Sequence, residues 1–331
     1  MSLSRPMSIS RSLALVLLLA VSLVQAAPKK TLPRPADPFA DPQNDPYNPL
    51  RYIASNVLTG IAFGLVVLVA FLQTWMVNKW GAKFMLSMVI GCYTFAIGLG
   101  TRFGLHTNPE SKGLYIIEYL FVVLSPCAFI ASEYVLLGRL ARYLNCDKHV
   151  LVNPRRISIL FISSDITTFL VQAAGGSVSI SSNTPSGAKI GSNISLAGLA
   201  MQAASFLSFT CIFFVFIHRV RTHEPEAWTL HASKKWHQDW RTLAAAMTFS
   251  FLGIIIRSVY RVAELSQGYV GKLATTESYF YALDTLPLFV AISIYVFFWP
   301  GRIIGDGVTA TPGIKEQSSI DSTSVPAEQK D

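Results

Sequence analysis

The stretch LAAAMTFSFLGIIIRSVYRVAEL, residues 243–265, decides how this chain folds. An apolar run over residues 243–256 leads without a break into Arg257, Arg261 and Glu264. At helical spacing these three side chains fall at i, i+4 and i+7, so they project from one face and can neutralise one another. The stretch therefore predicts a membrane-spanning helix that carries a charged stripe.

The composition of the whole chain agrees with a membrane protein. Of its 331 residues, 51% are hydrophobic and only 14% are charged, and the mean hydropathy is +0.43. A soluble protein of this size is less apolar. The net charge of +8 comes largely from basic residues in the links between apolar segments, where they orient helices, so we expect no nucleic-acid partner. The predicted fold class is an all-α, polytopic helix bundle.

Seven segments have the length of roughly 20 residues that a spanning helix needs. They lie at residues 55–77, 84–103, 114–137, 157–176, 194–217, 243–265 and 279–299. A seven-span domain is therefore predicted over residues 51–304.

The regions that flank this domain are expected to lie outside the bundle. Residues 1–26 have the basic start, short apolar run and small residues at the end that are typical of a cleaved signal peptide, and a retained signal anchor is the alternative. Residues 27–50 are rich in proline, and residues 305–331 are rich in Ser, Thr, Pro and Glu. Both regions are predicted to be disordered.

The distribution of Lys and Arg predicts how the domain is oriented. The first, third and fifth links carry most of these residues, including Lys79, Arg142 and Lys234, whereas the other links carry few. Positive charge accumulates on the cytosolic side, so the N-terminus is expected outside and the C-terminal tail in the cytosol. We expect a multi-pass protein of the plasma membrane, with a vacuolar or other endomembrane as the alternative.

Polar side chains recur inside the predicted spans, where a charge is costly unless it faces a polar surrounding. Counting about 1.5 Å per residue from the helix ends separates them into two sets. The set in the outer half of the membrane is Arg102, Glu118, Arg257, Arg261, Glu264 and Asp284, and Glu277 lies just above it. The set near the midplane is Asp165, Gln172 and Gln202. Together they predict a polar track from the midplane to the outer leaflet.

Two interpretations of these charges remain open at this point. Arg257 with Asp284, or Arg261 with Glu264, can form ion pairs that only fix helix packing. Alternatively, the charges line a cavity that accommodates a charged lipid headgroup, since ionisable groups inside a membrane mark functional sites by default.

Four stretches resemble the fungal RTA-like family, named for aminocholesterol resistance and also called lipid-translocating exporters. They are YIIEYLFVVLSPCAFIASEYVLLGRL (115–140), SSDITTFLVQAAGG (163–176), SLAGLAMQ (195–202) and RSVYRVAELSQGYVGKLATTESYFYALDTLPL (257–288). The resemblance implies a seven-span protein that exports or flips sphingoid long-chain bases, confers resistance to toxic sterols and drugs, or handles haem and porphyrins. The residues that it singles out are Asp165, Gln172, Gly175, Gly176, Arg257, Arg261, Glu264, Gly268, Glu277, Tyr281, Asp284 and Pro287.

One position departs from that family. Many members carry an acidic residue in the second span, seven positions before its arginine, and here Phe95 precedes Arg102. A coupling role for this carboxylate is therefore in doubt, unless Glu133 in the third span substitutes for it.

Enzymes and receptors are the rival classes. All six histidines fall in links or at span ends, and the chain has no phosphate-binding glycine loop, so we expect no enzyme, no metal and no cofactor. A seven-span receptor needs only an outer pocket, whereas a transporter needs polarity at the midplane, as Asp165, Gln172 and Gln202 offer. The sequence favours a translocator of amphipathic lipids, with membrane lipids as its partners, and keeps a lipid or stress sensor as the alternative.

Overall fold

The computed structural model describes residues 37–146, 149–150, 154–182, 184–229, 239–268 and 271–304. These residues form helices and turns and no strand, and seven helices are long and apolar enough to cross a membrane. The predicted all-α, seven-span class is confirmed. The predicted signal peptide at 1–26 and the predicted tail at 305–331 lie outside the described residues.

The first six spans are longer than the predicted segments, and the seventh begins and ends two residues earlier than predicted. Six of them are single helices: α2 (Asn56–Trp80), α3 (Leu86–Thr107), α4 (Lys112–Tyr143), α5 (Pro154–Ser181), α6 (Pro185–His223) and α8 (Trp240–Gln267). The seventh combines α9 (Glu277–Tyr279), the π-helical stretch η4 (Phe280–Thr285) and α10 (Leu286–Phe297). Three short elements complete the chain: the 3-10 turns η1 (Lys83–Met85) and η5 (Pro300–Arg302), and α7 (Pro225–Thr229).

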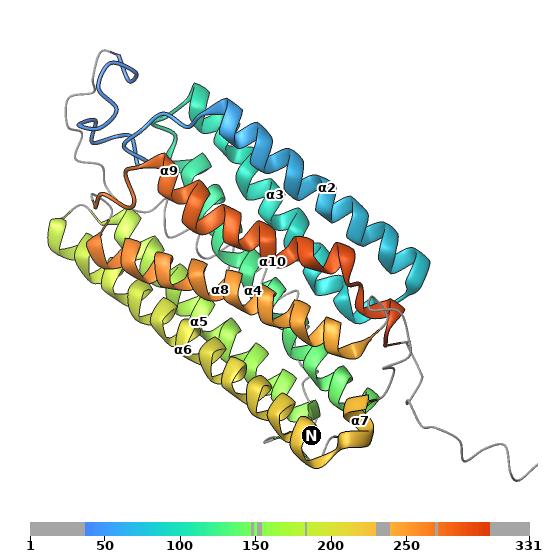
Figure 1. The fold of residues 1–331 in the computed structure, drawn as a ribbon. Helices are drawn as coiled ribbons and strands as arrows, with labels where there is room; N and C mark the ends of the chain where they lie inside the picture. Colours follow the sequence, from blue (N-terminus) through green and yellow to red (C-terminus); the bar gives the residue numbers. More distant parts are fainter. Residues whose placement is uncertain are drawn as a thin grey trace, which may run out of the picture.

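The helices lie along one long axis in an elongated bundle (Figure 1). Each span packs on its neighbour in the order α2, α3, α4, α5, α6, α8, α10, and α10 returns to α2, so the neighbours close a ring. The chain alternates between the two ends of this ring. We call them the Tyr52 end, where α2 begins, and the Trp299 end, where α10 finishes.

The sequence near each helix end explains where the spans begin and finish. The hydroxyls of Ser55 and Ser111 accept hydrogen bonds from the first turns of α2 and α4, and Asp239 does the same for α8. Gly81 and Gly268 follow α2 and α8 with φ of 72° and 75°, which favours glycine. These capping residues mark where the helices begin and end.

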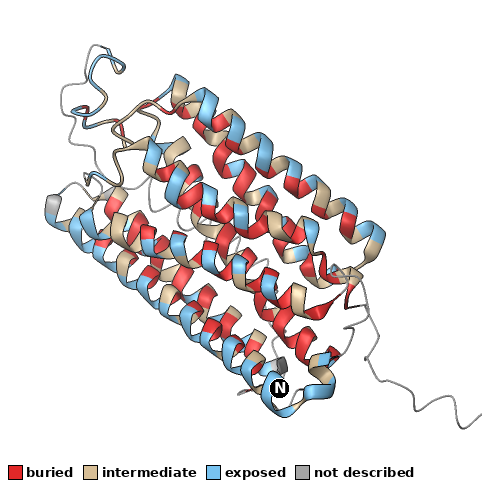
Figure 2. Cartoon of the chain, viewed as in Figure 1, coloured by how far each residue is buried: buried red, intermediate tan, exposed pale blue. Residues whose placement is uncertain are grey.

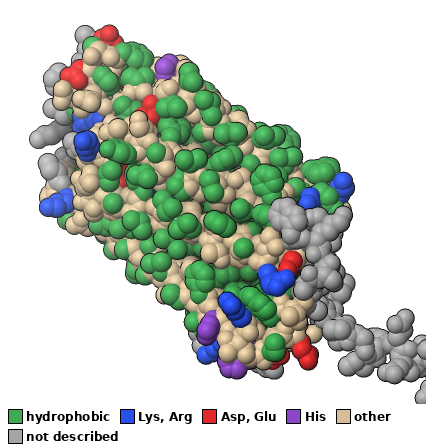
Figure 3. All heavy atoms as spheres, viewed as in Figure 1, with side chains coloured by type: hydrophobic (Ala, Val, Ile, Leu, Met, Phe, Trp, Pro, Cys, Tyr) green, Lys and Arg blue, Asp and Glu red, His purple; other side chains and the backbone are tan. Residues whose placement is uncertain are grey.

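The side chains are distributed as a bilayer requires. The outward faces of the helices are exposed and the inward faces are buried (Figure 2). Charged side chains gather toward the two ends of the visible surface, and the middle is mainly hydrophobic (Figure 3). Large apolar side chains such as Phe71, Ile159 and Val259 are more than half exposed. In a membrane these side chains face lipid tails.

Residues 37–50, which belong to the region predicted as a tail, are described in the structure. They form a series of turns in which Asp45 and Asn48 are buried. The Asn48 amide donates to the carbonyl of Tyr52, and its oxygen accepts from the backbone of Leu50 and Arg51. Such side-chain bonds to the backbone stabilise turns in a segment with little apolar content. This segment lies at the Tyr52 end of the bundle.

Candidate functional site

The first part of the site is built around Arg102, on α3. Its side chain is fully buried, and its Nη1 lies 2.5 Å from Glu118 Oε1 of α4. Nη2 lies 3.2 Å from Glu277 Oε1 of α9 and donates to the Tyr52 hydroxyl at 2.9 Å. Four separate parts of the chain thus meet at one guanidinium, and the predicted layer of Arg102, Glu118 and Glu277 exists in the structure.

Aromatic side chains surround this guanidinium. Burial raises the pKa of the Tyr52 phenol to about 12, although the charge of Arg102 acts in the opposite direction. Tyr52 is therefore neutral at physiological pH. The ring of Phe280 lies 4.3 Å from the guanidinium of Arg102 and 5.6 Å from that of Arg261, so it separates two cations and interacts favourably with both.

The second part of the site is the charged stripe of α8. Asp284 Oδ1 lies 3.1 Å from Arg257 Nε and 2.5 Å from Arg261 Nε. Arg261 also pairs with Glu264 at 2.9 Å. Both predicted ion pairs are present, but Asp284 pairs with both Arg257 and Arg261. All of these groups are largely buried, so their mutual contacts replace the water that they have lost.

The backbone of α4 supplies a further partner for Arg257. Pro126 lies inside α4 and has no N–H, so the Val122 carbonyl lacks its usual helical donor. Arg257 Nη2 donates to this carbonyl at 2.9 Å. A proline in the third span thus prepares an acceptor for an arginine in the sixth.

The shape of the seventh span brings Asp284 to α8. The Leu286 N–H bonds to the Tyr281 carbonyl, an i→i+5 bond that defines a π-helical turn. Pro287 follows, and a Cβ added at Gly253 of α8 would collide with the Pro287 carbonyl oxygen. The two helices therefore approach closely because residue 253 is glycine, and Asp284 meets Arg257 and Arg261, which lie about one and two turns further along α8.

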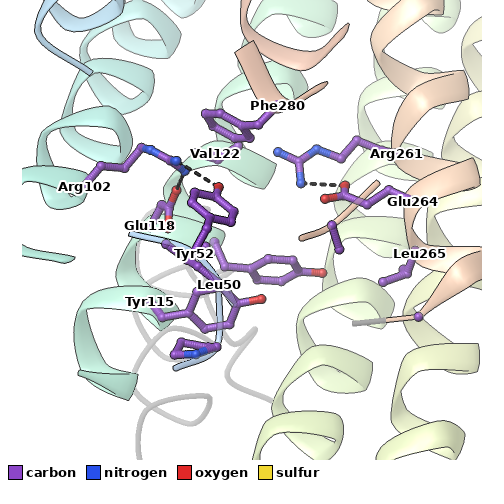
Figure 4. Close-up of a pocket in the computed structure, with 14 residues that line it drawn as sticks. Leu50, Tyr52, Arg102, Tyr115, Glu118, Val122, Arg261, Glu264, Leu265 and Phe280 are labelled. Atoms are coloured by element: carbon purple, nitrogen blue, oxygen red, sulfur yellow. Dashed lines mark hydrogen bonds and ion pairs between the residues drawn. The ribbon is translucent and has the colours of Figure 1, made fainter. Parts of the chain in front are cut away.

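A cavity lies between the two charged parts, with about 680 Å³ free of atoms, some of it open to solvent. Arg102 and Arg261 reach toward it from opposite sides, and Tyr52, Glu118, Glu264 and Phe280 also line it (Figure 4). Among the described residues that form the charged layer, three guanidinium groups meet four carboxylates. The layer therefore has one surplus negative charge when all of its groups are ionised.

A second cavity, of about 350 Å³, continues toward the middle of the bundle. It shares Tyr119, Arg261 and Glu264 with the first cavity and reaches Gln172 and Ser195. Polar groups thus continue from the Tyr52 end to Gln172.

Helices α5 and α6 meet closely beside the second cavity. Gln172 donates to Gln202 at 2.8 Å, so the predicted proximity of these two amides is confirmed. A Cβ at Gly175 would lie 2.5 Å from the backbone nitrogen of Ser195, and one at Gly176 would lie 3.2 Å from the ring of Tyr119. The two glycines therefore allow close packing of helices and line no ligand surface of their own.

Two further acidic side chains lie apart from the cavities. Asp165 Oδ2 accepts from the Tyr134 hydroxyl at 2.9 Å, and Asp165 lines neither cavity. Glu133 accepts from Ser250 at 2.6 Å and from Tyr295 at 2.6 and 2.7 Å. The predicted polar track therefore reaches Gln172, and Asp165 and Glu133 form separate buried pairs.

Sequence reasoning missed several members of the site. Tyr52 and Phe280 look like ordinary aromatic residues beside apolar segments. The Val122 carbonyl could have been found, because a proline four residues along a helix always frees a carbonyl. Among the described residues, no group of three or more His, Cys, Asp or Glu side chains could hold a metal ion.

The geometry defines a class: a seven-span membrane protein with a charged cavity buried in an otherwise apolar bundle. The chain belongs to the RTA1-like family, whose family model, described as "RTA1 like protein", matches residues 88–306.

Curated relatives from Saccharomyces cerevisiae are similar over most of the domain. Protein RTA1 is 29% identical over 224 residues, which are 68% of this chain and 67% of the relative. Protoporphyrin uptake protein 1 is 28% identical over 63% of this chain and 67% of the relative. The sphingoid long-chain base transporter RSB1 is 25% identical over 78% of this chain and 74% of the relative. No solved structure matches the chain.

Proposed function

We propose that this protein translocates amphipathic lipids with a cationic headgroup, foremost sphingoid long-chain bases, and thereby contributes to lipid export and to resistance against toxic amphiphiles. The observation that carries the proposal is the cavity between Arg102 and Arg261, which lies within a charged layer that has one more carboxylate than guanidinium groups. An ammonium headgroup that enters this cavity balances the charge of the layer.

The physical problem of lipid translocation suits such a cavity. A lone charge in the middle of a bilayer is disfavoured by several kcal/mol, whereas the hydrocarbon tail crosses without cost. Glu264 lines both cavities, so a headgroup that contacts this carboxylate stays paired while it moves from the first cavity to the second. The protein then needs to shelter only the headgroup.

The relatives support a transport role. One carries the name of a sphingoid long-chain base transporter, and another is named for protoporphyrin uptake. Sphingoid bases are cationic and single-chained, whereas porphyrins are planar acids, so the family spans more than one substrate class. For this chain the surplus carboxylate favours the cationic amphiphile. We further propose that the protein has no enzymatic activity, uses no cofactor and acts in the plasma membrane.

A receptor for membrane lipid or stress is the second candidate. It is favoured by the observation that the cavities begin at the Tyr52 end, whereas Asp165, the deeper carboxylate, lines neither of them. A sensor requires no path beyond such a pocket.

Reconstitution into vesicles separates the two candidates. Leaflet exchange of a labelled long-chain base is measured with the purified protein, and a ceramide without the ammonium serves as the control lipid. We expect faster exchange of the base than in protein-free vesicles. Glu264→Gln should slow this exchange at least tenfold, equivalent to about 1.4 kcal/mol. The matched change Glu226→Gln, at an exposed position of α7 that lines neither cavity, should leave exchange unchanged. Exchange at the protein-free rate, with or without an ion gradient, would favour the receptor.

A further inference from the structure

An apolar groove, separate from the two cavities, opens on the outside of the bundle between α2 and the seventh span. It has about 860 Å³ free of atoms, part of it open to the surroundings. Leu58, Ile61 and Leu65 of α2 form one wall, and Ala282 and Leu286 stand opposite them. These five side chains lie in membrane-spanning helices and are exposed, so the groove faces hydrocarbon.

The groove has polar atoms at its base. Tyr281 lines it, and the Tyr281 hydroxyl lies 2.9 Å from Thr59 Oγ1, which is fully buried. Thr285 also lines the groove, is only 4% exposed, and its hydroxyl has no hydrogen-bond partner in the described structure. An unpaired hydroxyl in an apolar surrounding is costly unless a ligand or water supplies the partner.

Tyr281 lies in the groove and also contacts a residue of the charged cavity. The Tyr281 ring lies 5.3 Å from the guanidinium of Arg102, which lines the cavity on the inner side. Other residues of the same π-helical stretch also lie on either the cavity side or the groove side. Asp284 contacts the arginines inside the bundle, whereas Ala282 and Thr285 line the groove. The stretch is thus a thin wall with a charged inner face and a lipid-facing outer face.

From this arrangement we infer that the groove is a lateral portal, which holds the hydrocarbon chain of a single-chain cationic amphiphile while its headgroup passes the Thr59–Tyr281 contact into the charged cavity. The inference rests on the proposed function and adds the route. The hydrocarbon chain of the amphiphile remains among apolar side chains that resemble lipid tails, so its free energy changes little when it enters the groove. The headgroup gains the carboxylates behind Tyr281.

The side chains at the two ends of this route determine which kind of lipid can follow it. The outer end is lined mainly by apolar side chains, which select a hydrocarbon chain. The inner end offers a charged layer with one surplus carboxylate, which selects a cation over an anion. A neutral lipid can enter the groove but is not drawn through the Tyr281 contact.

A bulky side chain in the groove tests the portal. Ala282→Trp fills it, and Ala204→Trp places the same side chain at an exposed position of α6 as a matched control. With the vesicle assay described above, we expect Ala282→Trp to slow exchange of the long-chain base at least fivefold and Ala204→Trp to leave it unchanged. Leu65→Trp replaces Ala282→Trp if the latter does not elute as a monodisperse protein.

Photolabelling provides a second measurement on the unmodified protein. A long-chain base with a diazirine in its alkyl chain should label peptides that contain residues 58–66 and 281–289, and excess unlabelled base should compete. The portal would be overturned if the wild-type protein exchanges the base, the two tryptophan variants do so at equal rates, and no competed label appears at the groove. This result would leave the proposed function intact. Competed labelling of the groove without any exchange would support the lipid site and refute translocation.

Discussion

Removal of Asp284 is the most severe single change that the charged layer predicts. Asp284 contacts both Arg257 and Arg261, and all three side chains are largely buried. Two unit charges about 4 Å apart interact with roughly 4 kcal/mol at an effective dielectric constant of about 20. Breaking one partner of a buried pair costs about 3–5 kcal/mol. In Asp284→Leu, Arg261 retains Glu264, whereas Arg257 retains only its contact with the Val122 carbonyl among the contacts described.

The corresponding double mutant Arg257→Leu with Asp284→Leu removes the uncompensated cation. A change of 1 kcal/mol shifts the melting midpoint by roughly 2–4 °C in a domain of 150–250 residues, so Asp284→Leu should lower the midpoint by roughly 6–20 °C. The double mutant should recover at least half of that loss. Thermal unfolding in detergent, followed by the remaining monodisperse fraction on size exclusion, measures both. Additive losses from the two substitutions would refute the shared ion pair.

Three further outcomes are expected. Gly175→Ala should lower the melting midpoint by several degrees, because its Cβ would lie 2.5 Å from a backbone nitrogen of α6, whereas Gly64→Ala, with nothing within 4 Å, should not lower it. Glu133→Leu should destabilise by about 1–3 kcal/mol through the hydroxyls it leaves unpaired, and adding Tyr295→Phe should reverse part of that loss in the same melting assay. A protease-sensitive reporter fused after Asp331 should be protected in intact cells, and its cleavage from outside would contradict the predicted orientation.

The sequence was sufficient for the number of spans and for the charged face of α8. Span count depends on length and hydropathy, and these are local properties of the chain. The face that carries Arg257, Arg261 and Glu264 depends only on helical spacing, and the structure keeps these three side chains together.

The partners across helices were harder to predict. Spacing places a residue on a face but does not fix how that helix is rotated against its neighbours. The π-helical stretch before Pro287 adds about 100° of rotation for its extra residue relative to a regular helix, and this determines which side of the seventh span Asp284 occupies. Depth along the helix grouped Asp165 with Gln172. In the structure Asp165 bonds to Tyr134, and of the two residues Gln172 lines the second cavity. The order in residues 37–50 depends on Asn48 contacts that hydropathy cannot detect.

The hydrogen bond between Arg257 and the Val122 carbonyl links two positions whose side chains need not touch. Pro126 has no backbone N–H, which leaves the Val122 carbonyl oxygen available to Arg257. Any other residue at position 126 would restore an N–H that competes with the arginine for this oxygen. Positions 126 and 257 should therefore vary together among relatives, with proline retained wherever the arginine is present. Transplanting the sixth span into another member of the family should succeed only when the proline of the third span accompanies it.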